Sequence, residues 1–193
     1  LETRGPLEIG ESVRISGTDR SPYGWACPPE AASLPAVKIP SVDSSVAPWS
    51  GCDPSRCLEG DPAFVASSAF FGSPPLDLGS ATLAHLKIVA SHVVSGGSLR
   101  IQPLEANGTC VTESLNNWGN PYDPGGACGD HFPGVYSEGD LVVRAGQGQG
   151  VLIVDGDLTV YGDFHYFGVV IVLGRFMSLG AGSQITGAVI VNN

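Results

Sequence analysis

The chain has 193 residues, of which 42% are hydrophobic, and it contains 27 glycines and 15 prolines. That apolar content is too high for a disordered chain, and the length is enough for one domain with a buried core, predicted to span residues 1–193. The net charge of -10 would repel a phosphate backbone or an anionic membrane surface, so we expect no nucleic-acid partner and no direct membrane contact by this piece.

The first predicted element lies in residues 1–17. Leu7 and Ile9 alternate with polar residues, and so do Val13 and Ile15. Alternation with a period of two is typical of a half-buried strand. This segment is predicted to be a strand or partial coil that docks on the solenoid described below, with a lone edge hairpin as the alternative.

Residues 18–133 are predicted to form a long, loop-rich insertion. Prolines punctuate residues 18–62 and make a helix unlikely there. One short helix is expected near residues 80–91, where apolar residues recur with helical spacing. Residues 93–101 predict a weak hairpin around two consecutive glycines.

Residues 134–193 carry the strongest pattern, a repeat of short β-branched runs that each meet a glycine. Equivalent residues recur every 17 to 19 positions: Gly139, Gly156 and Gly174, and Val154, Val172 and Val191. Three short strands with three corners fit such a period at about 3.3 Å per strand residue. The predicted fold is therefore mainly β, a short parallel β-solenoid or β-helix in residues 134–193 rather than a sandwich, with a disulfide-tied insertion and one short helix.

The five cysteines lie in Gly/Pro-rich loop sequence and have no spacing typical of a metal or redox site: Cys27, Cys52, Cys57, Cys110 and Cys128. They indicate disulfides and an oxidising compartment, at the cell surface or outside the cell. Cys110 and Cys128 bracket a polar loop and are the predicted pair. One further bridge is expected among the other three, in a pairing that the sequence leaves open, and the odd cysteine is either free or joined to a partner chain.

Acidic residues and one histidine gather at two predicted corners: Asp155, Asp157, Asp163 and His165. A Ca²⁺ site or an acid–base pair is one interpretation. The other is structural, because an Asp beside a Gly bonds the local backbone in a tight corner. We favour the structural interpretation and expect no metal.

Parallel β-helices include carbohydrate-active enzymes, which place several charged residues along one face of successive coils. No second row of carboxylates is seen here, and no G-x-S-x-G nucleophile elbow exists. Arg144 and Arg175 could lie one above the other, but two exposed charges on a solenoid face are usually solvated. We predict no catalytic residue and no cofactor, so the chain is not expected to be an enzyme.

Trp25, Trp118 and Tyr122 are candidate surface aromatics, suited to stacking on a glycan or filling a protein interface. Alternatively, the aromatic residues cover the side of the solenoid and anchor the insertion. Val189, Ile190 and Val191 form a bare apolar strand close to the last residue. Since unpaired strand edges recruit other chains, this strand predicts either stacking on another subunit or truncation.

A resemblance to a known family is carried by residues 150–174 and by three upstream pieces: Ile15–Asp19 with Pro22 and Trp25, Cys110 to Cys128 around Asn117–Pro121, and His131–Tyr136. Together they resemble the C-terminal region of bacterial type IV pilus assembly proteins of the PilX kind, which are pilin-like and membrane-anchored. The chain departs from that family by lacking the hydrophobic N-terminal pilin helix. It begins at Leu1 without a Met, so we expect a mature or trimmed piece, with any N-terminal membrane or export segment either removed or outside the given sequence.

A second resemblance, in fold pattern alone, is to bactofilins, the small β-solenoids that polymerise end to end. Bactofilins are cytoplasmic and lack this insertion and these cysteines. The predicted function is a non-catalytic structural component of a bacterial cell-surface appendage, pilus-associated or filament-forming, whose partners are protein subunits. The alternatives are a secreted adhesin or carbohydrate-binding module and, third, a β-helix carbohydrate-active enzyme.

Overall fold

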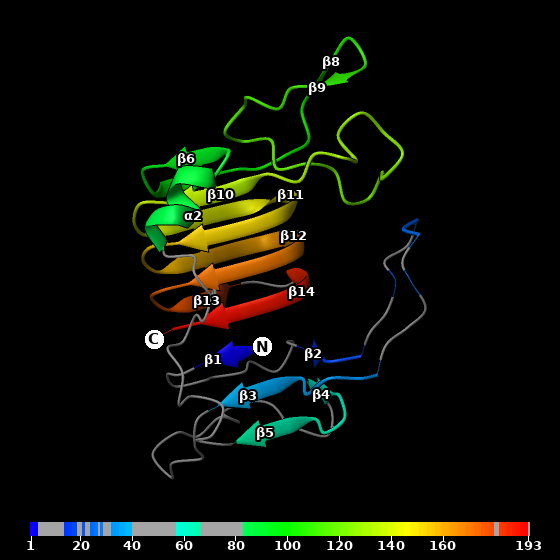
Figure 1. Ribbon diagram of the computed structural model, residues 1–193, viewed down its shortest axis with the longest axis vertical. Coiled ribbons are helices and arrows are strands. Elements are labelled where there is room, and N and C mark those ends of the chain that lie inside the picture. The colour runs from blue at the N-terminus through cyan, green and yellow to red at the C-terminus, as the bar shows by residue number, and fades with distance from the viewer. Residues whose placement is uncertain are drawn as a thin grey trace. The chain divides into compact units, whose positions relative to one another are not determined.

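The computed structural model describes residues 1–3, 14–18, 21, 24–26, 28, 32–39, 57–66, 83–179 and 182–192. Contacts divide the chain into two compact units, Leu1–Asp77 with Val191–Asn193 and Leu78–Ile190, where the sequence predicts a single domain. The strands described in both units pair in parallel, apart from one antiparallel hairpin in the second unit (Figure 1). No helix of the described residues is long and apolar enough to cross a membrane.

The first unit consists of short parallel strands from distant parts of the sequence. β3 (Val37–Ile39) pairs with β1 (Glu2–Thr3) and β5 (Phe64–Ala66), and β2 (Ile15–Ser16) pairs with β4 (Leu58–Glu59). Their apolar side chains form one buried cluster: Ala36, Val37, Ile39, Cys57 and Leu58. Residues 18–62 therefore contain strands as well as loops, which the proline-rich sequence did not predict.

β1 and β2 both fall within residues 1–17, where a strand or partial coil is predicted. Leu7, Ile9 and Val13, which carry the alternation, lie outside the described residues. The docking of this segment on the solenoid stays a prediction.

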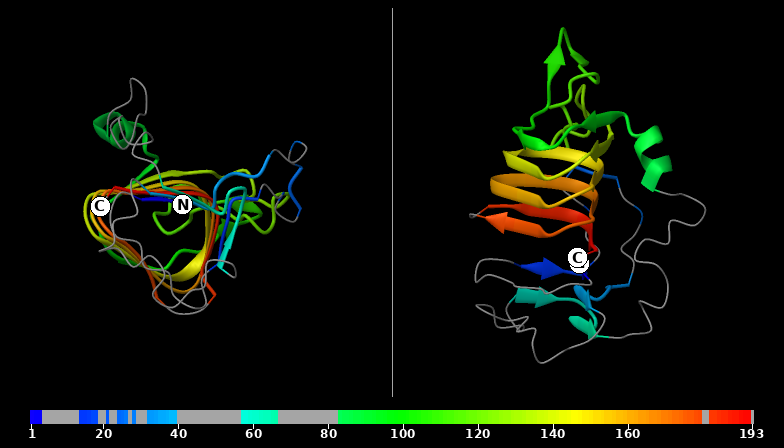
Figure 2. Two further views of the ribbon diagram at one scale, coloured as in Figure 1. Left: turned by 90° about the horizontal axis from the view of Figure 1, so that it is seen from below. Right: turned by 90° about the vertical axis from the view of Figure 1, so that its left-hand side faces the viewer.

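The second unit is the predicted parallel β-solenoid, and its coils stack with matching residues in register. Its coils are formed from residue 134 onward by β10 (Gly134–Ser137), β11 (Leu141–Val154), β12 (Leu158–Val172), β13 (Phe176–Leu179) and β14 (Gln184–Val191). Gly134 pairs with Val151, which in turn pairs with Val169, 17 and 18 positions further on. The yellow to red coils follow one another around a closed outline in Figure 2.

The solenoid begins before residue 134, which corrects both the predicted start of the coils and the predicted hairpin at residues 93–101. β6 (His92–Val94) pairs in parallel with β10, and β7 (Gly97–Leu99) pairs in parallel with β11. The two glycines at the junction of β6 and β7 turn the chain from one face of a coil to the next instead of folding it back. Gly96 and Gly97 have φ values of 84° and 91°, which suit such a corner.

Aliphatic side chains that stack from coil to coil fill two faces of the solenoid interior, and aromatic rings, among them Phe164 and Tyr166, fill the third. Val135, Leu152 and Val170 share one register position, and all three are fully buried. Leu141 and Leu158 form a second buried column on the next face. Stacking of this kind is the reason why a repeat of 17 to 18 residues with β-branched runs produces a solenoid.

One corner of the coil admits glycine alone. Gly150, Gly168 and Gly187 have φ values of 106°, 142° and 135°. A Cβ on Gly168 would collide with the carbonyl oxygen of Gly150, and a Cβ on Gly187 with that of Gly168. The backbone of each coil therefore passes directly over the backbone of the coil before it.

Two smaller elements belong to this unit. Helix α2 (Leu83–Val89) lies within the predicted residues 80–91, and its Lys87 pairs with Glu138. β8 (Glu105–Ala106) and β9 (Thr109–Cys110) form an antiparallel hairpin. Asn107 and Gly108 connect them with φ values of 52° and 75°, as a two-residue hairpin turn requires.

Candidate functional site

Strands β6 and β7 form two faces of the first coil. Its third face is assembled from three separate pieces of chain. The carbonyl oxygen of Ile101 lies under Gly146, so that a Cβ at Gly146 would strike it. The backbone N–H groups of Gln149 and Val151 then bond the carbonyls of Trp118 and Pro133. Between these points the chain leaves the coil twice, once before and once after Trp118. We call the whole segment, residues 102–132, the excursion loop. It is the candidate functional site.

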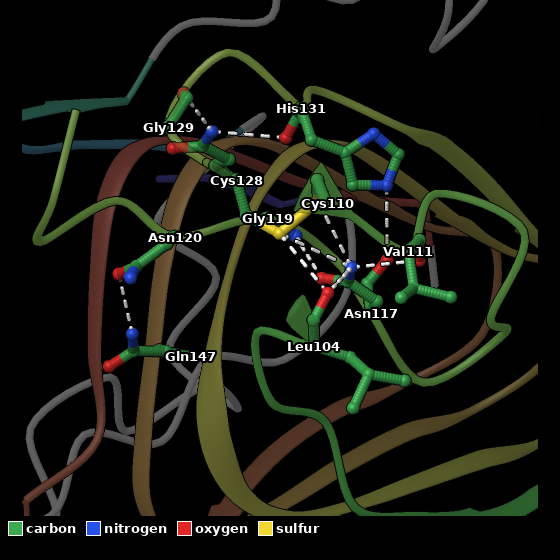
Figure 3. The surroundings of a disulfide bond; sticks show 11 residues. Leu104, Cys110, Val111, Asn117, Gly119, Asn120, Cys128, Gly129, His131 and Gln147 are labelled. Carbon is green, nitrogen blue, oxygen red and sulfur yellow. Dashed lines mark hydrogen bonds between the residues drawn. A yellow bond between two sulfur atoms is a disulfide. The ribbon is translucent and has the colours of Figure 1, made fainter. Parts of the chain in front are cut away.

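The disulfide between Cys110 and Cys128 closes this loop, as predicted (Figure 3). Inside it lies Asn117, which is fully buried. The Asn117 amide nitrogen donates to the carbonyls of Leu104 and Val111 over 3.1 and 2.9 Å, and it contacts both sulfur atoms. A single amide thus satisfies the backbone of the loop that the disulfide closes.

Trp118 is fully buried, which corrects its prediction as a surface aromatic. Its indole N–H donates to the Leu115 carbonyl over 2.8 Å, and its ring meets the buried ring of Tyr166 edge-on at 6.3 Å. Gly148 lies between them, where a Cβ would stand only 2.8 Å from that of Trp118. The absence of a side chain at Gly148 is what lets two large rings share this part of the core.

Gln149 bonds the excursion loop to the outer side of the third face. Its amide nitrogen donates to the carbonyls of Gly129 and His131 over 2.7 and 3.0 Å, and the residue is fully buried. The neighbouring outward residue, Gln147, donates to Asn120 over 2.7 Å. The loop therefore covers side chains that would face solvent on a bare solenoid.

Tyr122 continues this cover over the next coil and is itself 48% exposed. Its hydroxyl bonds Nδ1 of His165 over 2.7 Å, and its ring lies edge-on to Phe167 at 5.4 Å. Partial burial raises the pKa of the Tyr122 phenol. Tyr122 is thus anchored to the coil while about half of it stays exposed, whereas Trp25, the remaining aromatic candidate, is half-buried.

Two histidines lie where the loop returns to the first coil. The rings of His92 and His131 have centroids 5.9 Å apart and planes tilted by 53°. Nε2 of His131 donates to the Asn117 carbonyl over 3.2 Å, and Nε2 of His92 is buried without a hydrogen-bond partner in the described part of the chain. Burial lowers the pKa of His131, and the positive charge of a protonated His92 would lower it further.

The acidic corner residues have structural partners. Oδ1 of Asp140 accepts the backbone N–H of Asp157 over 2.8 Å, and Oδ1 of Asp157 accepts that of Arg175 over 2.8 Å. Asp155 accepts the hydroxyl of Tyr136. Within the described ranges, no three His, Cys, Asp or Glu side chains gather as metal ligands would.

Arg144 and Arg175 do not lie one above the other, an arrangement that the sequence had left open. Arg144 pairs in register with Tyr161 at the end of one face, and its guanidinium lies 5.3 Å from that ring. Arg175 occupies the preceding corner, in the position equivalent to Asp157. The corner after Arg144, which contains the bulge between Arg144 and Gly146, is therefore a different corner from the one at Asp157 and Arg175.

The remaining candidate residues are placed only in part. Cys57 is disulfide-bonded, and Cys27 and Cys52 lie outside the described residues, so the pairing of the second bridge stays open. Of the candidate assembly residues on β14, Val189 and Ile190 are half-buried and Val191 is 8% exposed. Their role in assembly stays a prediction.

Reasoning from the sequence did not single out as site residues four side chains that organise the loop: His92, Asn117, His131 and Gln149. One overlooked signal was the spacing of Gly150, Gly168 and Gly187 at 18 and 19 positions. This spacing places Gln149, the residue before Gly150, on the outer side of the third face. Which part of the chain covers that residue depends on the excursion loop.

Comparisons with known protein families, with curated proteins and with solved structures find no match for this chain. The disulfide is typical of proteins that fold in an oxidising environment.

Proposed function

We propose that the chain is a non-catalytic structural component of a bacterial cell-surface appendage, pilus-associated or filament-forming, that acts through contacts with protein subunits. The use of the corner carboxylates carries this proposal. Asp140 and Asp157 stand at equivalent corners of successive coils, so two carboxylates do line up across coils, which corrects the prediction from the sequence. Both are engaged by backbone N–H groups of the next coil, which assigns them to stacking.

The setting outside the cytoplasm is supported by the disulfide and by the resemblance to PilX-like proteins. Cys110 and Cys128 close a loop that holds its fold around one buried amide, Asn117. A loop of this kind needs an oxidising compartment to keep its bridge. The surface of an appendage provides such a compartment.

Exposed apolar side chains support a role in subunit contacts. Ile88 and Val89 on α2 are 77% and 73% exposed, and Phe132 at the end of the excursion loop is 51% exposed. Large apolar side chains that gather on a surface commonly mark protein interfaces. These exposed residues are where subunits would meet.

Electron microscopy and sedimentation velocity over a range of concentrations test this proposal. Ordered filaments or defined oligomers are expected. The double variant Ile88→Glu with Val89→Glu should shift the assembly to higher concentration, since it places two charges on an exposed apolar ridge. Thr109→Glu with Thr112→Glu is the matched control, because it adds the same charge at exposed loop positions. Monodisperse single chains at every concentration, together with no binding to appendage subunits, would contradict the proposal.

A second function, carbohydrate binding, is favoured by one observation, the exposed ring of Tyr122 beside the amides of Asn120 and Gln147. Aromatic faces flanked by amides suit the stacking and hydrogen bonding of sugars. Binding to a glycan array that is lost in Tyr122→Ala and retained in Tyr161→Ala, a second exposed tyrosine, would support it. Trp118→Ala is unsuitable as a diagnostic because Trp118 is buried. Release of reducing ends from a polysaccharide would instead support an enzyme.

A further inference from the structure

His92 and His131 form a pair that nothing in the proposed function uses. His92 lies on β6 in the first coil and is 3% exposed. Its Nε2 is buried and has no hydrogen-bond partner in the described part of the chain. A polar atom that is buried without a partner costs about 1–3 kcal/mol, so such an atom calls for an explanation.

The neutral ring of His131 has a defined tautomer. Because a carbonyl oxygen only accepts hydrogen bonds, the contact between Nε2 and the Asn117 carbonyl requires a proton on Nε2. In the neutral ring, Nδ1 then carries a lone pair. Figure 3 shows Nε2 turned toward Asn117 and the second ring nitrogen turned away from it.

This arrangement is typical of histidines that bind metal ions. A metal-binding histidine usually donates its other N–H to a backbone carbonyl or a carboxylate, which fixes the tautomer and the orientation of the ring. Here the carbonyl belongs to Asn117, whose side chain is held within the disulfide-closed loop. The His131 ring is therefore positioned by a rigid part of the molecule.

The separation of the rings fits one shared ion. Bonds from an imidazole nitrogen to zinc are about 2.0–2.1 Å, so two rings on one ion have centroids roughly 5–6.5 Å apart. The observed separation is 5.9 Å, with the planes tilted by 53°. Tilted ring pairs without an ion span the same range of separations, so the ring distance permits a shared ion, and the unpartnered Nε2 of His92 is what calls for one.

We propose that His92 Nε2 and His131 Nδ1 bind a divalent transition-metal ion of the class that prefers imidazole, such as Zn²⁺ or Cu²⁺. The ion would join the first coil to the returning end of the excursion loop. No third protein ligand stands nearby among the described residues, so water completes the coordination and the ion exchanges. This inference is independent of the proposed function.

Titration of the full-length, disulfide-intact chain with ZnCl₂ and, separately, with CuCl₂, followed by calorimetry, tests the proposal. One equivalent of either ion should bind, and the midpoint of thermal unfolding should rise. His92→Leu and His131→Gln should each weaken binding by at least about tenfold. His85→Gln, which removes an exposed histidine on α2, is the matched control and should bind as the wild type does. Equal binding by all four proteins, or none by the wild type, would overturn the proposal.

A spectroscopic measurement on the wild type covers the case in which a variant fails to fold. Electron paramagnetic resonance of the Cu²⁺-loaded chain should show couplings from two imidazole nitrogens. Coupling from one nitrogen, or from backbone amides alone, would mean that the two histidines do not share an ion. A water bridge would then explain the unpaired Nε2 of His92, and the site would be rejected.

Discussion

The carboxylate of Asp157 binds both the backbone N–H and the guanidinium of Arg175, which stands at the same corner one coil later. Oδ1 accepts the N–H over 2.8 Å, and Oδ2 accepts Nε and a terminal guanidinium nitrogen over 3.1 and 2.8 Å. The backbone N–H lowers the pKa of Asp157 most, and the Arg175 side chain lowers it further. The charged form of this residue therefore holds two coils together.

Replacing Asp157 with Asn should reduce the free energy of unfolding by about 1–3 kcal/mol at neutral pH, because a charged acceptor is exchanged for a neutral one. The pKa of Asp157 is lower in the folded chain than its ordinary value of 3.8. The stabilisation is therefore complete above that ordinary value and is lost as the pH falls through the folded value. Denaturant unfolding measured from about pH 2 to about pH 7 should show the free energies of unfolding of wild type and variant converging in acid.

Asp130→Asn is the control for this measurement. Asp130 is exposed and lies away from the solenoid corners, so its replacement should change the free energy of unfolding little. A wild type and an Asp157→Asn variant that differ by the same amount at every pH would show that the charge of Asp157 is not what binds the coils.

Gly168→Ala should destabilise the solenoid by about 3 kcal/mol or more, since the residue combines backbone strain with a direct collision. Its φ of 142° is unfavourable for any residue with a side chain, and the new Cβ would strike the carbonyl of Gly150. Gly139→Ala is the matched control, because a Cβ there meets nothing within 4 Å. Thermal unfolding of both variants checks this expectation, and equal midpoints would show that the corner opens without cost.

Removing the disulfide by changing both Cys110 and Cys128 to Ser should cost about 3 kcal/mol, because the bridge spans 18 residues and its loss frees the unfolded chain. The double variant leaves the second bridge at Cys57 intact, which a reducing agent would not. Hydrogen exchange at the Asn117 and Gly119 amides should rise more than exchange in β12. A uniform rise across the solenoid would mean that the loop and the coils unfold as one unit.

Trp118→Ala should reduce stability by about 3–5 kcal/mol, the usual effect of removing a large buried ring. Tyr122→Ala removes an aromatic from the same loop but from its surface, and it should cost about 1 kcal/mol, mainly through the bond to His165. Chemical unfolding of the two variants measures the difference. Similar losses in both would indicate that the outer cover of the loop stabilises the fold as much as its buried ring.

The period of 17 to 19 residues was enough to predict a parallel solenoid, because stacking requires each coil to place like residues at like positions. It could not show where the coils begin. His92–Val94 and Gly97–Leu99 form the first coil, yet the excursion loop separates them from the repeat and hides their register. Repeats interrupted by an insertion lose the constant spacing on which the prediction depends.

Loop position and spacing also predicted the bridge between Cys110 and Cys128, whose sulfur atoms only had to close a local segment. By itself the sequence determined the fold class, the short helix and this bridge, all of which follow from local spacing and residue type. The tertiary structure alone decided that Trp118 and Gln149 are buried and that His92 meets His131. Burial of these side chains depends on which distant segment covers them, and the alternation of residues along a single strand carries no information about that.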